Sequence, residues 1–413
     1  MPGDLGFIFK AYDVRGVYPD EFDEDAAFRI GRAFAAWTGS DRILIGRDCR
    51  TSSPALSSAF ADGVTMSGTG VADMGLATTD LLYFASGRMS LPGAMFTASH
   101  NPPEYNGLKL CRSGAAPVGE DSGLQHVRRL AEQDAGGPTS PRGGRQSVDL
   151  LEEYLEHVLS FADVSALSPL VVAADAANGM AGLVIPPLFE RLPIKLVPLY
   201  MELDGMFPNH PADPIVPENQ EDVKRAVIEN GADVGLAFDG DADRVFFVDE
   251  NAQGISGSLI TALVAIGMLE RYPGATVLHN VICSRVVPEV IREHGGEPVR
   301  TRVGHSFVKK VMADTGAVFG GEHSGHYYFR DHYRADSGIV AAVVVMDQMS
   351  KAGKPLSELL APLRRYRDSG EINSKVTDQQ ATIEKIAAAH GGERQDRLDG
   401  LTVESDDWWF NVR

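Results

Sequence analysis

Three short apolar runs recur along the chain, and each enters a small or polar turn before a helical pattern begins. They are RILIGRDCR (42–50), LVVAADAANG (170–179) and TVLHNVICSR (276–285). Continuous apolar strands that alternate with helices are typical of buried, largely parallel sheets. Because the runs lie about a domain apart, the sequence predicts three similar α/β modules.

Two polar stretches divide the chain. DAGGPTSPRGGR (134–145) is too rich in Gly and Pro for a helix or strand interior, and RRYRDSGEINSK (364–375) precedes a last segment of different character. That segment carries a helical piece and then a predicted two-stranded hairpin around Asp406 and Asp407. We therefore expect four domains, at residues 1–145, 146–252, 253–365 and 366–413.

The charge balance limits the possible partners. The chain has 57 Asp and Glu against 38 Lys and Arg, a net charge of −19, which repels nucleic acid and anionic lipid. An anionic substrate must therefore be bound by a local group of cations. The longest apolar runs, 259–269 and 339–346, are far shorter than the roughly 20 residues of a membrane helix, and we expect two buried core helices there.

The cysteines and the first residues indicate the compartment. Cys49, Cys111 and Cys283 are far apart and odd in number, which argues against a disulfide framework or a zinc site. The chain begins without a cationic segment followed by an apolar stretch, the pattern of a secretory signal. We expect a cytoplasmic protein, monomeric or weakly dimeric.

The segment FTASHNPPEYNGLK (96–109) is the first candidate for chemistry. Ser99 follows an apolar run and precedes a loop that two prolines and a glycine keep irregular. A serine on such a loop, with His100 and Lys109 close in sequence, suits covalent phosphoryl transfer. A capped turn is the plainer interpretation of Ser-His alone. A serine hydrolase is disfavoured, because no G-x-S-x-G surrounds Ser99.

The segment VGLAFDGDADRVFFVDE (234–250) is the second candidate. Asp239, Asp241 and Asp243 alternate after an apolar strand, so three hard oxygen ligands suited to Mg²⁺ or Ca²⁺ converge in one loop. An EF-hand would need Gly where Arg244 stands, and its loop would join helices rather than strands. An aspartyl-phosphate phosphotransferase with Asp239 as nucleophile remains a second alternative.

Two weaker segments complete the set. In GGEHSGHYYF (320–329), glycines flank Glu322 and Ser324, a carboxylate and a hydroxyl that suit sugar hydroxyls. Basic residues that could attract a phosphosugar occur in KAYDVRG (10–16) and RVGHSFVKK (302–310). They are Lys10, Arg15, Arg302, Lys309 and Lys310.

Together, in this order, the four segments resemble the α-D-phosphohexomutase family, and GEHSGH is similar to the motif of its phosphomannomutase/phosphoglucomutase subgroup. The resemblance implies three related α/β domains with mixed sheets and a small α+β C-terminal domain around a central cleft. It also implies an isomerase that interconverts hexose 6-phosphate and hexose 1-phosphate of glucose or mannose. Mg²⁺ and a hexose 1,6-bisphosphate intermediate would take part.

The resemblance also implies roles for single residues. Ser99 would carry the phosphoryl group and, with Asp239, Asp241 and Asp243, hold Mg²⁺. Arg244 and Lys109 would steady the transferred group, with Lys109 and His326 as candidates for general acid and base. Glu322 and Ser324 would bind sugar hydroxyls. Further cleft positions of the family match Tyr12, Arg15, His100 and His305.

Two departures from the family pattern have consequences. Many relatives carry a Lys near Ile282, so one positive contact is expected to be absent or supplied elsewhere. Relatives also continue past WWFNVR into a Ser/Thr-rich phosphate-binding loop, whereas this chain ends at Arg413. We therefore expect an incomplete, truncated fourth domain and weak mutase turnover, because binding of the remote phosphate orients the reacting end. A phosphoglucosamine mutase or a catalytically weak sugar-phosphate-binding protein are the alternatives.

Overall fold

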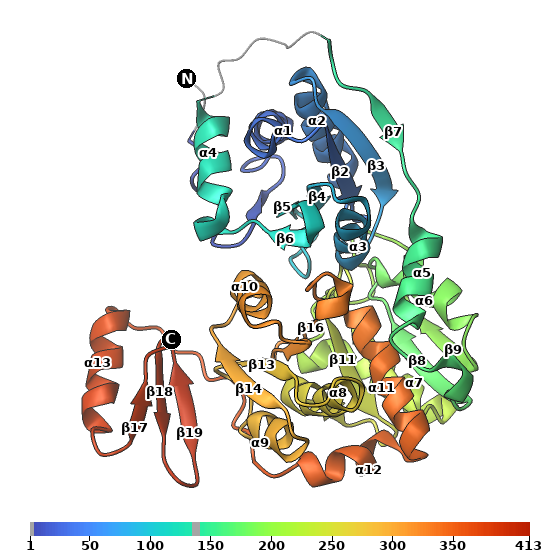
Figure 1. Ribbon diagram of the computed structural model, residues 1–413, viewed down its shortest axis with the longest axis vertical. Helices are drawn as coiled ribbons and strands as arrows, with labels where there is room; N and C mark the ends of the chain where they lie inside the picture. The colour runs from blue at the N-terminus through green and yellow to red at the C-terminus, as the bar shows by residue number, and fades with distance from the viewer. Residues whose placement is uncertain (1–3, 134–140) are drawn as a thin grey trace.

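Each of the three apolar runs forms an interior strand of its own sheet. These strands are β2 (Arg42–Arg47), β8 (Leu170–Asp175) and β13 (Thr276–Asn280). The structure, a computed structural model, describes residues 4–133 and 141–413. Most side chains of the three strands are buried, and helices follow each of them. The predicted arrangement of three α/β modules and a small C-terminal domain is confirmed (Figure 1).

The first domain contains a mixed sheet of seven strands in the order β1-β5-β4-β2-β3-β7, with β6 paired to β5. Its remaining strands are β1 (Val14–Val17), β3 (Gly70–Leu76), β4 (Gly93–Phe96), β5 (Tyr105–Arg112), β6 (Ala116–Pro117) and β7 (Arg145–Ser147). Its helices are α1 (Glu24–Thr38), α2 (Ser53–Met66), α3 (Thr79–Met89) and α4 (Leu124–Glu132). The predicted linker at 134–145 lies mostly outside the described residues. Strand β7 extends the first sheet to Ser147 by pairing with β3.

The second domain follows the helix α5 (Leu151–Leu159) and has a five-stranded sheet in the order β12-β11-β10-β8-β9. Its other strands are β9 (Ile194–Leu199), β10 (Val234–Phe238), β11 (Val245–Asp249) and β12 (Gly254–Ile255), and its helices are α6 (Ala181–Phe189) and α7 (Glu221–Asn230). Strands β10 and β11 are antiparallel and completely buried. The aspartate segment is therefore a tight connection between two core strands.

The third domain has a four-stranded sheet in the order β14-β13-β15-β16. Its other strands are β14 (Glu297–Thr301), β15 (Phe319–Gly321) and β16 (Tyr327–Phe329), and its helices are α8 (Gly257–Arg271), α9 (Val286–Glu293), α10 (His305–Thr315), α11 (Gly338–Ala352) and α12 (Leu356–Leu360). The two longest apolar runs lie in α8 and α11, which pack against each other. Both are the predicted core helices. Of the described helices, none combines the length and the apolar character that crossing a membrane requires.

The fourth domain consists of α13 (Gln379–Ala389) and an antiparallel sheet of β17 (Arg394–Asp396), β18 (Leu401–Glu404) and β19 (Trp409–Val412). The predicted hairpin is confirmed as β18 and β19. This domain has a small apolar core of its own and lies beside the third domain (Figure 1). The Arg285 guanidinium attaches it by donating to the backbone oxygens of Ser405 (2.6 Å), Asp406 (3.1 Å) and Trp408 (3.2 Å).

The first three domains share one continuous apolar core. Side chains of α3, α5, α6, α8, α9 and α11 belong to a single buried cluster, whereas α1, α2 and α4 cover the other face of the first sheet with a separate one. At the junction the Asp80 carboxylate accepts hydrogen bonds from Tyr154 (2.6 Å), Ser337 (2.5 Å) and Thr78 (2.5 Å). The relative placement of these domains is therefore fixed by packing and by directional bonds.

A buried histidine, His332, and the half-buried His157 at the same junction predict how stability depends on pH. His157 Nε2 lies 3.1 Å from His332 Nδ1, and burial together with the neighbouring His157 lowers the pKa of His332 to about 3. The unfolded chain takes up this proton near pH 6.5, so stability present at pH 7 is lost as the pH falls below that value. At pH 5 we expect the loss from His332 to be about 2 kcal/mol at most.

The measurement is urea unfolding at pH 7 and pH 5. His332→Gln removes the titrating ring, so this variant should lose less stability between the two pH values than the unchanged protein. His126→Gln, at an exposed position on α4, is the control and should keep the full pH dependence. Equal pH dependence of all three proteins would contradict the prediction.

Candidate active site

Ser99 lies in the loop between β4 and β5, at the carboxyl end of the first sheet. Its backbone has φ 50°, a left-handed conformation that is uncommon for a residue other than glycine. The Thr97 hydroxyl oxygen accepts a hydrogen bond from the Ser99 N–H (2.9 Å) and stabilises this turn. Strained backbone of this kind is retained only where the surroundings hold it in place.

Arg50, which the sequence reasoning missed, holds the Ser99 loop. Its fully buried guanidinium donates to the backbone oxygens of Ser99 (2.8 Å), Asn101 (2.7 Å), Pro102 (2.7 Å) and Tyr105 (3.0 Å). The Nε–H also donates to Asp48 (3.2 Å), which balances the charge. A planar fork of donors is what such a set of carbonyls requires. The only local sequence signal was an arginine just after an apolar strand.

The aspartate loop joins β10 to β11, which confirms that strands and not helices flank it. All three carboxylates are buried: Asp239, Asp241 and Asp243. Glu250, the twelfth residue counted from Asp239, instead accepts a hydrogen bond from Ser357 at the start of α12, so an EF-hand is excluded. Gly240 lies against the Ser99 loop, since a Cβ there would come within 2.4 Å of the Ser99 carbonyl oxygen.

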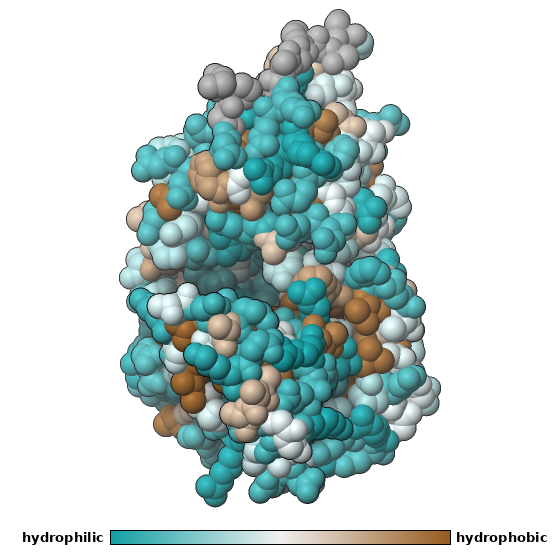
Figure 2. Space-filling model, turned by 90° about the vertical axis from the view of Figure 1, so that its left-hand side faces the viewer, coloured by the Kyte–Doolittle hydropathy of each residue, from teal (hydrophilic) through white to brown (hydrophobic). Residues whose placement is uncertain are grey.

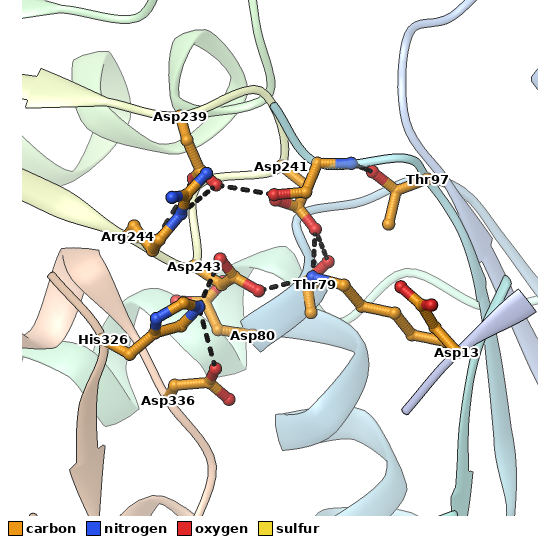
Figure 3. A network of polar contacts seen from close by, with 12 residues as sticks. Asp13, Thr79, Asp80, Thr97, Asp239, Asp241, Asp243, Arg244, His326 and Asp336 are labelled. Atoms are coloured by element: carbon orange, nitrogen blue, oxygen red, sulfur yellow. Dashed lines mark hydrogen bonds and ion pairs between the residues drawn. The ribbon is translucent and has the colours of Figure 1, made fainter. Parts of the chain in front are cut away.

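The two loops meet in one network (Figure 3). The Ser99 hydroxyl donates to Asp239 Oδ2 at 2.8 Å, and Arg244 Nε donates to the same oxygen at 2.9 Å. Lys109 Nζ contacts Asp241 Oδ2 (2.7 Å) and Asp243 Oδ2 (2.5 Å). Serine, lysine, arginine and three aspartates, predicted separately from distant segments, therefore form a single cluster.

The charges of this cluster shift one another's pKa values. Burial, with the nearby carboxylates of Asp243 and Asp241, raises the pKa of Asp239 despite the opposing Arg244. Burial alone would lower the pKa of Lys109, but Asp241 and Asp243 outweigh it and hold the pKa well above its ordinary value. Lys109 therefore stays protonated at neutral pH, and the aspartates favour any cation that enters.

The aspartate loop fits a divalent metal ion. One oxygen from each of its three carboxylates lies within 4.8 Å of the others. Asp241 Oδ1 and Asp243 Oδ1 are buried without a hydrogen-bond partner among the described residues, so they are free to act as ligands. The Ser99 hydroxyl oxygen lies beside Asp239 as a further hard donor. Such an all-oxygen set suits Mg²⁺ or Ca²⁺ rather than a soft metal.

Most of the predicted site residues line one pocket. Figure 2 shows the molecule hollowed between the first domain and the domains below it, with a mainly hydrophilic surface around the hollow. The pocket is lined by the predicted residues Tyr12, Arg15, Ser99, His100, Lys109, Asp243, Arg244, His305 and His326. It is also lined by Asp13, Tyr83 and Asp336, which the sequence reasoning missed. Of these, only Asp13 stood in a segment already singled out.

The third-domain residues approach from the loop between β15 and β16. His326 Nε2 lies 3.8 Å from Asp243 Oδ1 and 4.0 Å from Asp336 Oδ2, and Ser324 Oγ lies 3.1 Å from His326 Nδ1. Glu322 is buried just behind them. Its carboxylate accepts from the Tyr328 hydroxyl (2.6 Å), the Asn280 amide (2.9 Å) and the Gly304 N–H (3.2 Å). Its orientation is therefore fixed, and sugar binding by Glu322 stays a prediction.

Two histidines in the pocket are neutral. Burial and the positive charge of Arg244 lower the pKa of His100 to about 3, and burial with Lys309 lowers that of His305 to about 3. His100 Nδ1 lies 3.3 Å from Ser99 Oγ. A neutral imidazole at that distance can exchange a hydrogen bond with the hydroxyl without adding charge to the site.

Four of the five predicted basic residues divide into two groups, and the fifth, Arg302, is exposed in the loop between β14 and α10. Arg15 contacts Asp13 and Asn101 in the pocket (both 2.5 Å). Lys309 is buried, pairs with Asp336 at 2.7 Å and lies 3.9 Å from the centre of the Tyr83 ring. Lys10 and Lys310 are exposed outside the pocket, as ordinary surface charges.

Comparisons with known proteins agree with this geometry. The chain matches the phosphoglucomutase/phosphomannomutase alpha/beta/alpha domain I at residues 6–135, domain II at 152–254 and domain III at 256–366. It is 40% identical to the phosphomannomutase of Salmonella montevideo and 39% identical to that of Escherichia coli K12. In each case the match covers 98% of this chain and 91% of the relative.

A solved structure extends the likeness to three dimensions. A phosphoglucomutase/phosphomannomutase family protein from Burkholderia thailandensis superposes with a TM-score of 0.88 and is 34% identical, over 99% of this chain and 90% of that one. This chain therefore belongs to the phosphoglucomutase/phosphomannomutase family of phosphohexomutases, which are isomerases.

The hydrogen bonds of Arg50 predict a large effect of its removal. Arg50→Met should destabilise the protein by about 3–5 kcal/mol, because Asp48 is left as a buried unpaired charge. Hydrogen exchange of the amides in residues 98–106 should accelerate as well. The control is Arg145→Met. It removes an exposed arginine of β7 that pairs with Asp62 of α2, and it should cost less than about 1 kcal/mol. Similar stability losses in both variants would contradict this account of Arg50.

Proposed function

We propose that the chain interconverts hexose 6-phosphates and hexose 1-phosphates, as a phosphomannomutase/phosphoglucomutase, through a phosphoryl group carried on Ser99. The observation that carries the proposal is the contact of Ser99 Oγ with the aspartate loop, 2.8 Å from Asp239, in a pocket lined by Arg15, Lys109 and Arg244. Phosphoryl transfer needs this combination of a hydroxyl, a metal-binding loop and fixed cations. The names of the relatives support mannose and glucose phosphates as substrates.

Mg²⁺ is the proposed metal, held by Asp239, Asp241, Asp243 and an oxygen at Ser99. When bound, it would neutralise charge on the phosphoryl oxygens during transfer. Lys109 and Arg244 are placed to supply further positive charge from two sides, and both are held by the aspartates of the same loop. Their rigid placement matters because charge stabilisation is most effective where donors need not reorganise.

The first half-reaction moves the phosphoryl group from the protein to the sugar. The free hydroxyl of a hexose monophosphate attacks phosphorus, a new sugar O–P bond forms, and the Ser99 Oγ–P bond breaks with its electron pair on Oγ. The hydroxyl proton passes to His326, where Asp243 and Asp336 would stabilise the imidazolium. Oγ regains a proton from Lys109, which its carboxylate partners keep charged at neutral pH.

The product of that step is a hexose 1,6-bisphosphate. We infer that it turns over within the pocket and returns its other phosphate to Ser99, with each bond change and proton transfer reversed. Glu322 and Ser324 would bind sugar hydroxyls in both orientations. Hydroxyls that glucose and mannose share would then be recognised and the one at C2 would not, which supports activity on both sugars.

The experiment is peptide mass spectrometry after incubation with Mg²⁺ and glucose 1,6-bisphosphate. We expect phosphate on Ser99, none on Ser99→Ala, and loss of the label when glucose 6-phosphate is added. Chelation of the metal should slow phosphorylation by at least about 100-fold, since several kcal/mol of charge stabilisation are removed.

Two results would overturn the proposal. Phosphate on Asp239, labile to hydroxylamine, would indicate an aspartyl-phosphate enzyme. The absence of phosphate on any residue would leave a protein that binds sugar phosphates without transferring them.

A further inference from the structure

Arg302 is a cation that the network described above does not use. It lies in the short loop between β14 and α10 and is exposed. Within residues 4–133 and 141–413 its guanidinium forms no hydrogen bond or ion pair with another residue. This is unusual in a chain with 57 acidic residues against 38 basic ones. The guanidinium is therefore available to an anion from outside the protein.

The position of Arg302 is nevertheless well defined. Its guanidinium carbon lies 4.2 Å from the centre of the Phe307 ring, a cation–π contact. The backbone of the loop is fixed at both ends, because Thr301 pairs with Asn280 in the sheet and the Val303 N–H donates to Asp399 (2.9 Å). An arginine arranged in this way loses little conformational entropy when it binds a ligand.

A chain of aromatic contacts connects Arg302 to the pocket. Phe307 meets the Tyr12 ring edge-on at 5.8 Å, and Tyr12 lines the pocket together with Ser99. Burial raises the pKa of Tyr12, and the charge of Arg302 is the largest effect that opposes it. Arg302, on the third domain, therefore lies within electrostatic reach of Tyr12, a residue that lines the pocket.

The two arginines and the lysine that line the pocket already have carboxylate partners. Arg15 contacts Asp13, Lys109 contacts Asp241 and Asp243, and Arg244 contacts Asp239. In the proposed function these groups act on the transferred phosphoryl group. A hexose bisphosphate carries a second dianion at the other end of the sugar, and that dianion needs a cation of its own.

We propose that Arg302 binds the phosphate group that is not being transferred, an inference that rests on the proposed function. The ends of β13 and β14 support the proposal. Parallel pairing places Asn280 at the end of β13 opposite Thr301 at the end of β14, so Ile282 and Arg302 come just after two adjacent strand ends. Arg302 therefore supplies positive charge at this edge of the sheet, where Ile282 is apolar and supplies none. The guanidinium offers a planar pair of donors to the phosphate oxygens and anchors the remote end of the sugar.

The test measures binding separately from chemistry. In a Ser99→Ala background, titration calorimetry with Mg²⁺ and glucose 1,6-bisphosphate gives an affinity that needs no phosphoryl transfer, and one phosphate of this probe always lies away from residue 99. Arg302→Gln should weaken binding about tenfold, the loss of one charge-assisted contact. Arg302→Lys should fall between, because it keeps the charge and loses the fork.

The matched control is Arg129→Gln, which removes the same charge from an exposed position on α4. It should stay within about twofold of the background protein, since distant exposed charges are screened. Added salt should also weaken binding more in the background protein than in Arg302→Gln. Equal affinities of Arg302→Gln and Arg129→Gln would overturn the inference. Failure of the proposed function would instead appear as unphosphorylated Ser99 in the unchanged protein.

Discussion

The compensation of three buried carboxylates by two buried cations determines how this molecule is assembled. Asp239, Asp241 and Asp243 belong to the second domain, Arg244 follows them directly, and Lys109 comes from the first domain. Each buried ion costs several kcal/mol of desolvation, so the charges are tolerable only in contact with one another. The first and second domains are therefore held together by the same cluster in which we propose that a metal and a phosphoryl group bind.

A second set of contacts repeats this principle at the third domain. Lys309 and Asp336 form a buried ion pair beside Tyr83 of the first domain, and the carboxylate of Asp336 is also the neighbour of His326. The group that we propose as proton acceptor is thus oriented by a residue whose own position depends on the contact between domains. Correct docking of three domains and correct placement of the reacting groups are consequently one structural requirement.

Much of this arrangement could be predicted because its signals are local in the sequence. The strands before Ser99 and Asp239 are continuous apolar runs, and the polar residues after them lie at the same edges of their sheets. Arg50 could not be found in this way, since the backbone oxygens that it contacts lie 49 to 55 residues away and carry no sequence signal. Asp336 pairs with Lys309, which is 27 residues away on another element, and no local pattern indicates that pair. The hydrogen bonds that Glu322 accepts from Asn280 and Gly304, 42 and 18 residues away, have the same non-local origin.

The pairing of charges also explains how an acidic protein can hold an anionic substrate. Lys109 and Arg244 do not form a free basic patch, since carboxylates of the aspartate loop already contact them. A divalent cation at that loop would neutralise the same carboxylates, and the field of both side chains would then act on the transferred phosphoryl group. Arg302, which has no carboxylate partner among the described residues, exerts its field without such a step. The two ends of a bisphosphate would therefore be bound in different ways, one dependent on the metal and one independent of it.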